Sequence, residues 1–115
     1  GLESITLEQA LQLAKRSNKL VLADMSAIWC PACRKLDEQV FSNERVKTQL
    51  KQDFVYVRIE YESPKGKSFM QNYQVTGFPT LLVLNTRAEK LIQLPIDYEP
   101  LPFLATLEKV VNDRR

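Results

Sequence analysis

A short apolar segment leads directly to the only two cysteines of the chain, and this junction limits the possible folds most. Residues 20–25, Leu-Val-Leu-Ala-Asp-Met, lack the alternation of apolar and polar side chains that is typical of a half-buried strand. They therefore predict a strand that is buried on both faces, in the centre of a sheet. Residues 31–41 predict a helix, so we expect Cys30 and Cys33 where a central strand gives way to a helix.

Two cysteines separated by two residues at a helix start have the placement of a reactive thiol pair. Only the thiolate of a cysteine is a good nucleophile, and the unpaired N–H groups and the dipole at a helix N-terminus favour a negative charge there. We expect Cys30 to be the exposed nucleophile. Cys33 follows by nearly one turn, where it can attack a mixed disulfide formed at Cys30. Pro31 suits the first turn, because the helix needs no N–H at that position.

A zinc site and a structural disulfide are the alternatives to redox exchange. Zinc normally takes four ligands, and the chain has no further cysteine and no histidine, so a site would need carboxylates or a second subunit. A disulfide across two intervening residues closes a very short loop and restricts the unfolded chain little. The pattern therefore favours thiol–disulfide exchange, and we expect neither a metal nor another bound cofactor.

The absence of histidine also limits the acid–base chemistry, because it excludes Cys-His pairs and Ser-His-Asp triads. Asp24 lies near the end of the predicted central strand, where burial would raise the pKa of its carboxyl group and favour the protonated form. A buried acid near two thiols can accept the proton of Cys33 as that cysteine attacks. The alternative is a strand-end aspartate that faces water, and the residues alone favour neither.

Length and composition are those of one soluble globular domain spanning residues 1–115, with 44% apolar and 26% charged residues. The net charge of +2 comes from 16 Lys and Arg against 14 Asp and Glu, a balance that gives no reason to expect nucleic acid or an anionic membrane as a partner. No apolar stretch approaches the roughly 20 residues of a membrane span. The chain begins with Gly1 and shows no signal peptide, which we expect of a processed chain, and we expect a monomer.

The rest of the chain predicts helices and strands in alternation. Helices are expected at residues 7–17 with Thr6 as N-cap, from Ser42 as N-cap to about Leu50, at 68–73 after a loop at 62–66, and from Pro100 or Leu101 onward. Strands are expected at 54–60, 81–84 and 90–94. This order predicts an α/β fold, a three-layer α/β/α sandwich around a central mixed sheet, with the last two strands as an antiparallel edge hairpin. The last helix is expected to bury Leu101, Leu104, Leu107 and Val111.

Three features at characteristic offsets make the chain resemble the thioredoxin superfamily from about Lys19 to its end. They are the Trp29-Cys30-x-x-Cys33 motif, Asp24 six residues before the first cysteine, and the segment Gly77-Phe78-Pro79-Thr80. The resemblance implies the thioredoxin fold and thiol–disulfide oxidoreductase activity. It also favours the buried, proton-accepting role of Asp24 over the water-facing alternative.

The resemblance further implies a surface on which a protein substrate docks. A cis peptide bond between Phe78 and Pro79 would expose the backbone of Gly77 and Phe78 to a substrate strand. Trp29 and Pro31, on either side of Cys30, would shape the same surface.

Within the superfamily, the Cys-Pro-Ala-Cys motif followed by residues 41–46 is similar to the thioredoxin-like group that includes the C-terminal domain of the reductant DsbD. In that group an acid at the offset of Asp37 lies near the active site, which makes Asp37 a secondary candidate. The alternative is an exposed helix carboxylate beside Arg34. By this resemblance we expect protein thiols and disulfides and an upstream thiol electron donor as partners of this chain. We expect a periplasmic or otherwise exported compartment, with the cytoplasm as the alternative.

The direction of exchange is expected from the residues between the cysteines. Pro31 and Ala32 bring no charge and no side-chain donor that would stabilise a thiolate, so we expect a reducing dithiol and a reductase role. A disulfide oxidase or isomerase is one alternative, and a non-catalytic thioredoxin-like binding module is the other.

Overall fold

The strand that precedes the cysteines is the centre of the molecule. The structure, a computed structural model, describes residues 5–114. Its strands are β1 (Leu20–Ser26), β2 (Phe54–Glu60), β3 (Thr80–Leu84) and β4 (Lys90–Gln93), in the sheet order β2-β1-β3-β4. Its helices are α1 (Leu7–Ser17), α2 (Pro31–Leu36), the π-helix η1 (Asp37–Phe41), α3 (Glu44–Asp53), α4 (Pro64–Tyr73) and α5 (Pro100–Arg114).

All seven residues of β1 are buried, so the prediction of a central strand is confirmed. β1 pairs with β2 in parallel and with β3 antiparallel, which makes the sheet mixed as expected. The terminal hairpin differs from the prediction, because its first strand, β3, lies beside β1 and only β4 is at the edge. The burial explains the difference: β3 is buried throughout, whereas every residue of β4 is exposed.

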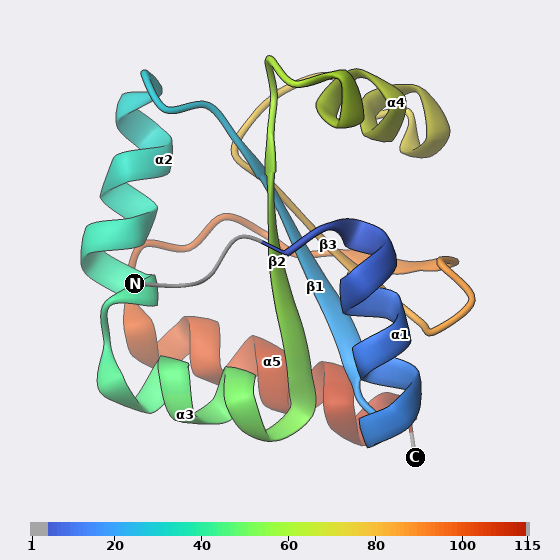
Figure 1. Ribbon diagram of the computed structural model, residues 1–115. Coiled ribbons are helices and arrows are strands. Elements are labelled where there is room, and N and C mark those ends of the chain that lie inside the picture. Colours follow the sequence, from blue (N-terminus) through green and yellow to red (C-terminus); the bar gives the residue numbers. More distant parts are fainter. Residues whose placement is uncertain (1–4, 115) are drawn as a thin grey trace.

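Helices cover both faces of the sheet and complete the predicted three-layer sandwich (Figure 1). Successive side chains of a strand point to opposite faces, so Leu20 and Leu22 contribute to one core and Val21 and Ala23 to the other. The first core also takes buried residues of α2, η1, α3 and α5, and the second takes those of α1 and α4. α2 therefore starts at the end of a strand that is held from both sides.

Two helix starts differ from the sequence prediction because a neighbouring side chain makes the cap. Asn43, not Ser42, caps α3, since its Oδ1 accepts hydrogen bonds from the N–H groups of Arg45 and Val46. Ser63 caps α4 by accepting from the Gly66 N–H at 2.9 Å, so residues 64–66, expected in a loop, are helical. The capping box of Thr6 with Gln9 on α1 is present as predicted.

The apolar stripe of α5 is centred differently from the prediction. Phe103 and Leu107 are fully buried, while Leu104 and Val111 pack against the same core from its margin. Leu101 is exposed, because the positions at Phe103 and Leu107 define an inner face that turns Leu101 toward solvent. Its expected place in the core is therefore wrong.

The predicted helix over residues 31–41 is continuous but not regular. It passes at Asp37 from α2 into the π-helix η1, where the Ser42 N–H donates to the carbonyl oxygen of Asp37 at 2.9 Å. Such π segments are frequent at functional sites. Here the irregular turn keeps Val40 in the core and leaves the Asp37 side chain beside Arg58 of β2.

Candidate active site

Cys30 is the N-cap of α2, and Cys33 lies in its first turn. The Sγ atom of Cys30 accepts a hydrogen bond from the backbone N–H of Cys33 at 3.1 Å. Both cysteines are free thiols in this structure. One of the unpaired N–H groups at the helix start is thus satisfied by the sulfur that we expect to act as the nucleophile.

Both thiols are less accessible than the sequence suggested. Cys30 is 5% exposed and Cys33 is 4% exposed, so the expectation of an exposed Cys30 is wrong for the reduced state. The cause is local packing: both cysteines cluster with Ala27, against which Tyr61 and Phe78 also pack. Access to the sulfur of Cys30 therefore depends on this apolar rim.

The two cysteines differ in their electrostatics. Burial raises the pKa of the Cys33 thiol well above its ordinary value, and its hydrogen bonding with Cys30 acts in the same direction. Cys33 is therefore held as a neutral thiol near neutral pH. It needs a proton acceptor before it can attack.

We expect iodoacetamide to label Cys30 before Cys33 when the reduced protein is treated near neutral pH. Alkylation requires a thiolate, and the raised pKa keeps the thiolate fraction of Cys33 low. Peptide mass spectrometry after brief treatment would show the order, with the protein unfolded in denaturant as the control in which the preference should vanish. Faster labelling of Cys33 in the folded protein would contradict the assignment.

Asp24 is buried, as the resemblance implied, and is 1% exposed. Burial raises the pKa of its carboxyl group, and hydrogen bonding from Tyr56 and the charge of Arg58 partly oppose this rise. The alternative of a water-facing aspartate is therefore wrong. The strand register explains the surroundings, because Asp24 lies opposite Arg58 of β2.

A connected set of polar side chains surrounds Asp24. The hydroxyl of Tyr56 donates to Oδ2 of Asp24, and Nη2 of Arg58 lies 3.3 Å from the same oxygen. Arg58 also forms an ion pair with Asp37, whose side chain is about one-third exposed. Asp37 is thus connected to Asp24 through one guanidinium group, and its ion pair is with Arg58 rather than with Arg34 as in the exposed alternative.

Tyr56 and Arg58 were missed by the sequence reasoning. They are two residues apart in β2, so both side chains lie on the same face of the sheet. That signal was available, but which residues they would meet depends on the register between β1 and β2. The sequence contains no marker of that register.

The residues expected to dock a substrate lie around Cys30. The Phe78–Pro79 peptide bond is cis, and the half-exposed ring of Trp29 lies 5.3 Å from the ring of Phe78, centre to centre. Pro31 occupies the first turn of α2. The carbonyl oxygen of Gly77 accepts a hydrogen bond from the Thr80 hydroxyl at 2.6 Å, so part of the loop backbone expected to be free is engaged.

Two further residues on this surface were not expected. Tyr61 follows β2, and its ring centre lies 4.7 Å from that of Phe78 and 6.5 Å from that of Trp29. The indole N–H of Trp29 donates to Glu62, which fixes the exposed ring in place. Tyr61 and Glu62 lie just past the end of the strand parallel to β1, a position that is close to the motif only after the sheet has formed.

A cavity of about 170 Å³ adjoins Cys33. Its lining includes Cys33, Arg34, Asp37, Arg58 and Glu60. Polar groups and the thiol of Cys33 therefore share one space that is wide enough to admit water.

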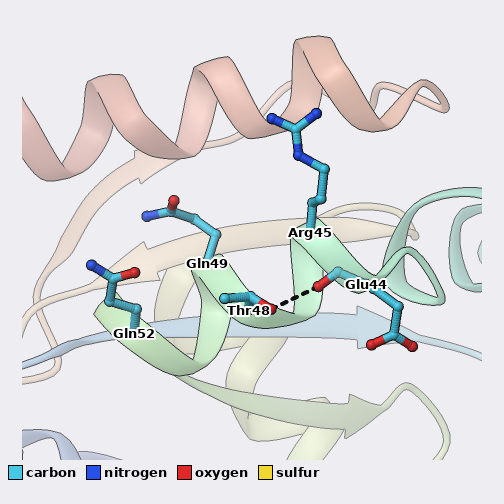
Figure 2. A pocket seen from close by; sticks show the side chains of 5 residues that line it. All are labelled: Glu44, Arg45, Thr48, Gln49 and Gln52. Atoms are coloured by element: carbon cyan, nitrogen blue, oxygen red, sulfur yellow. Dashed lines mark hydrogen bonds between the residues drawn. The ribbon is translucent and has the colours of Figure 1, made fainter.

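A larger hollow lies elsewhere and contains none of these groups. Figure 2 shows it on α3, facing α5, where it is lined by Glu44, Arg45, Thr48, Gln49 and Gln52. The hydrogen bond drawn there is an internal one of the helix, from the Thr48 hydroxyl to the carbonyl oxygen of Glu44. The chemistry that we can assign therefore belongs to the smaller cavity beside Cys33.

Across residues 5–114 no group of three or more Cys, Asp or Glu side chains is arranged to hold a metal ion. Among the helices that the structure describes, none combines the length and the apolar character needed to cross a bilayer.

Comparison with known proteins agrees with this geometry. The thiol:disulfide interchange protein DsbD of Vibrio vulnificus is 29% identical over 110 residues, which are 92% of this chain but only 18% of that protein. The solution structure of a thioredoxin from Thermus thermophilus superposes with a TM-score of 0.81 at 26% identity, over 95% of this chain and 86% of that one. The oxidised C-terminal domain of Neisseria meningitidis DsbD shares the fold, with a TM-score of 0.77 at 18% identity over 95% of this chain and 98% of that domain.

The chain thus spans less than a fifth of the length of the DsbD proteins that it matches. Over residues 2–86 it matches the family described as Thioredoxin-like. These residues include the dithiol, Asp24 and the cis-proline loop. The chain therefore belongs to the thioredoxin-like family and has the thioredoxin fold, with DsbD-like domains among its relatives.

Proposed function

We propose that the chain is a thiol–disulfide oxidoreductase that acts on protein disulfides through Cys30 and Cys33. The observation that carries the proposal is the dithiol at a helix start, together with a buried carboxyl group, Asp24, whose charge acts on Cys33. Cys30 caps the helix through its sulfur, Cys33 is kept neutral by burial, and Asp24 supplies an acceptor for the proton of Cys33. No bound cofactor is required, because the two sulfurs carry both electrons.

The reduction of a substrate disulfide takes two exchange steps. In the first, the thiolate of Cys30 attacks one substrate sulfur, a mixed disulfide forms and the other substrate sulfur leaves as a thiolate. In the second, Cys33 gives its proton to the carboxylate of Asp24 and attacks Sγ of Cys30, which releases the second substrate sulfur. The substrate has then gained two electrons and the protein holds a Cys30–Cys33 disulfide, which an upstream dithiol protein reduces again.

The apolar rim of Cys30 is the proposed docking surface for the substrate. We assign to it Trp29, Pro31, Gly77, Phe78 and Pro79, together with Tyr61, whose ring packs near Trp29 and Phe78. Aromatic side chains give a large contact area at a low cost in conformational entropy, and free loop backbone can pair with an extended substrate segment. Recognition of this kind reads the shape of the substrate more than its sequence.

The proposed direction is reduction, in a periplasmic or otherwise exported compartment and as a monomer. The resemblance to the DsbD group supports the direction and the compartment, and the motif residues Pro31 and Ala32 support the direction. The charge of Asp24 acts against ionisation of Cys33, and a dithiol whose thiolate is disfavoured is less oxidising.

We expect a reduction potential nearer that of thioredoxin, about −270 mV, than that of DsbA, about −120 mV. Equilibration with glutathione buffers, followed through the fluorescence of Trp29, measures it. A potential above about −160 mV would overturn the reductase assignment and favour the oxidase or isomerase.

A reduction assay separates the enzyme from a non-catalytic binding module. The wild-type protein should accelerate the reduction of insulin by dithiothreitol, and the variant in which both cysteines are replaced by serine should not. If the wild-type rate equals that of dithiothreitol alone, the enzymatic proposal fails.

A further inference from the structure

We propose that Tyr56 is a positioning residue for Asp24: with Arg58, its hydroxyl holds Oδ2 of the carboxyl group and leaves Oδ1 as the oxygen that exchanges the proton. The inference deepens the proposed function and rests on it, because it concerns how Asp24 would serve as the acceptor. The dithiol motif does not contain Tyr56, and the register of two strands places it at the site.

The two oxygens of Asp24 have unequal surroundings. Oδ2 accepts from the Tyr56 hydroxyl and from Nη2 of Arg58 at 3.3 Å. Oδ1 is buried and has no hydrogen-bond partner within residues 5–114. A carboxyl oxygen has two lone-pair positions, so the two donors fill Oδ2. When Asp24 is neutral, its proton therefore belongs on Oδ1.

The hydrogen-bond pattern also fixes the role of Tyr56 as a donor. Its hydroxyl oxygen accepts from Arg58, at 3.1 Å from Nη2 and 3.3 Å from Nε, so its own hydrogen is directed at Asp24. Burial raises the pKa of the Tyr56 hydroxyl above its ordinary value, and the nearby Asp24 charge acts in the same direction. Tyr56 therefore keeps its proton across the neutral range and positions the acid instead of replacing it.

The position of the Tyr56 ring depends on the helix that carries the second acid. The ring packs against Phe41 of η1 with 5.4 Å between the centres, and Asp37 of the same π-helix binds Arg58. One face of η1 thus supports both groups that hold Oδ2.

The variant Tyr56→Phe tests the proposal, because it keeps the ring on Phe41 and removes only the hydroxyl. Loss of this donor destabilises the ionised form of Asp24, so its pKa should rise by about one unit. Carbon-13 NMR of the Asp24 carboxyl group measures that pKa without turnover. The rate of the second exchange step, measured from a preformed mixed disulfide, should rise with pH as Asp24 ionises, and this rise is the rising limb of its pH profile. In the variant this rise should occur at a higher pH, by the same amount as the pKa change. Well above that limb the rate should equal the wild-type rate.

Two further variants make the result specific. Tyr73→Phe is the matched control, since it removes a hydroxyl that donates to the Ala88 carbonyl at 2.6 Å, away from the cysteines, and it should shift neither quantity. Arg58→Met removes the other donor to Oδ2 and should shift both in the same direction as Tyr56→Phe. It also provides a second test if Tyr56→Phe does not fold.

The outcomes separate this proposal from the proposed function. If Tyr56→Phe lowers the stability but leaves the Asp24 pKa unchanged, Tyr56 only packs and the proposal is overturned. If the pKa rises and the rate limb shifts with it, the proposal is supported. If the pKa rises but Asp24→Asn retains the wild-type rate limb, the positioning by Tyr56 stands and the proton-accepting role of Asp24 falls.

Discussion

Replacing Cys33 by serine should make the protein accumulate mixed disulfides, and replacing Cys30 should lower exchange by about a thousandfold or more. The first step needs the sulfur of Cys30, because a serine hydroxyl is not ionised near neutral pH and does not attack a disulfide. Without Cys33 the first step still occurs, but the mixed disulfide cannot be resolved internally. Non-reducing electrophoresis and mass spectrometry with a disulfide-bonded peptide would detect the trapped species on Cys30.

The buried state of both thiols makes this result informative. Because Cys30 and Cys33 are almost equally buried, accessibility alone predicts no preference between them. The preference must come from the N–H of Cys33 that Cys30 accepts and from the raised pKa of Cys33. The double replacement Cys30→Ser with Cys33→Ser is the control and should trap nothing. Equal trapping by Cys30→Ser and Cys33→Ser would contradict the order of the two steps.

The sequence was sufficient where the signal was local. Residues 20–25 predict a buried strand because no polar side chain interrupts them before Asp24, and the structure buries all of them. The spacing of Cys30 and Cys33 and the proline between them define the helix start. These features need only the neighbouring residues, so no knowledge of the tertiary structure was required.

The sequence was insufficient where two distant segments had to be aligned. Arg58 and Tyr56 are 34 and 32 positions from Asp24, and only the pairing of β1 with β2 brings them together. The predicted N-cap of α3 was wrong for another reason. Ser42 and Asn43 are both good N-cap residues, but the Ser42 hydroxyl donates to the carbonyl oxygen of Glu38 and Asn43 makes the cap. Which of two adjacent residues becomes the cap depends on how the preceding helix ends. Here the preceding helix is the π-helix η1.

Replacing Asp24 by asparagine should slow the second exchange step by about a hundredfold and at the same time stabilise the protein at neutral pH. The rate falls because a neutral amide cannot accept the proton of Cys33, and the rising limb of the pH profile should disappear. The stability rises because the variant no longer carries an acid whose ionisation the interior disfavours. Arg58 is half-exposed and keeps its ion pair with Asp37, so the replacement leaves no buried cation without a partner.

The pH dependence of that stabilisation follows from the sign of the Asp24 pKa shift. Burial raises the pKa in the folded state above the value of about 3.9 in the unfolded chain. Below the unfolded value both states hold the proton, and Asp24 costs nothing. As the pH rises from there to the folded pKa, the unfolded chain releases its proton first, so the wild-type protein loses stability relative to Asp24→Asn. The variant should therefore be more stable at pH 7 by on the order of 1–3 kcal/mol, with a gain that shrinks toward zero below about pH 4.

Urea unfolding of the reduced proteins at pH 4 and pH 7 would measure both parts of this expectation. Asp113→Asn is the matched control, because it makes the same chemical change at an exposed position of α5 and should alter the stability little at either pH. If the gain in stability of Asp24→Asn is the same at pH 4 and at pH 7, the effect comes from packing. A loss of stability at pH 7 would mean that the hydrogen bonds from Tyr56 and Arg58 outweigh the cost of burying the charge, and Asp24 would then be a structural anion instead of a proton acceptor.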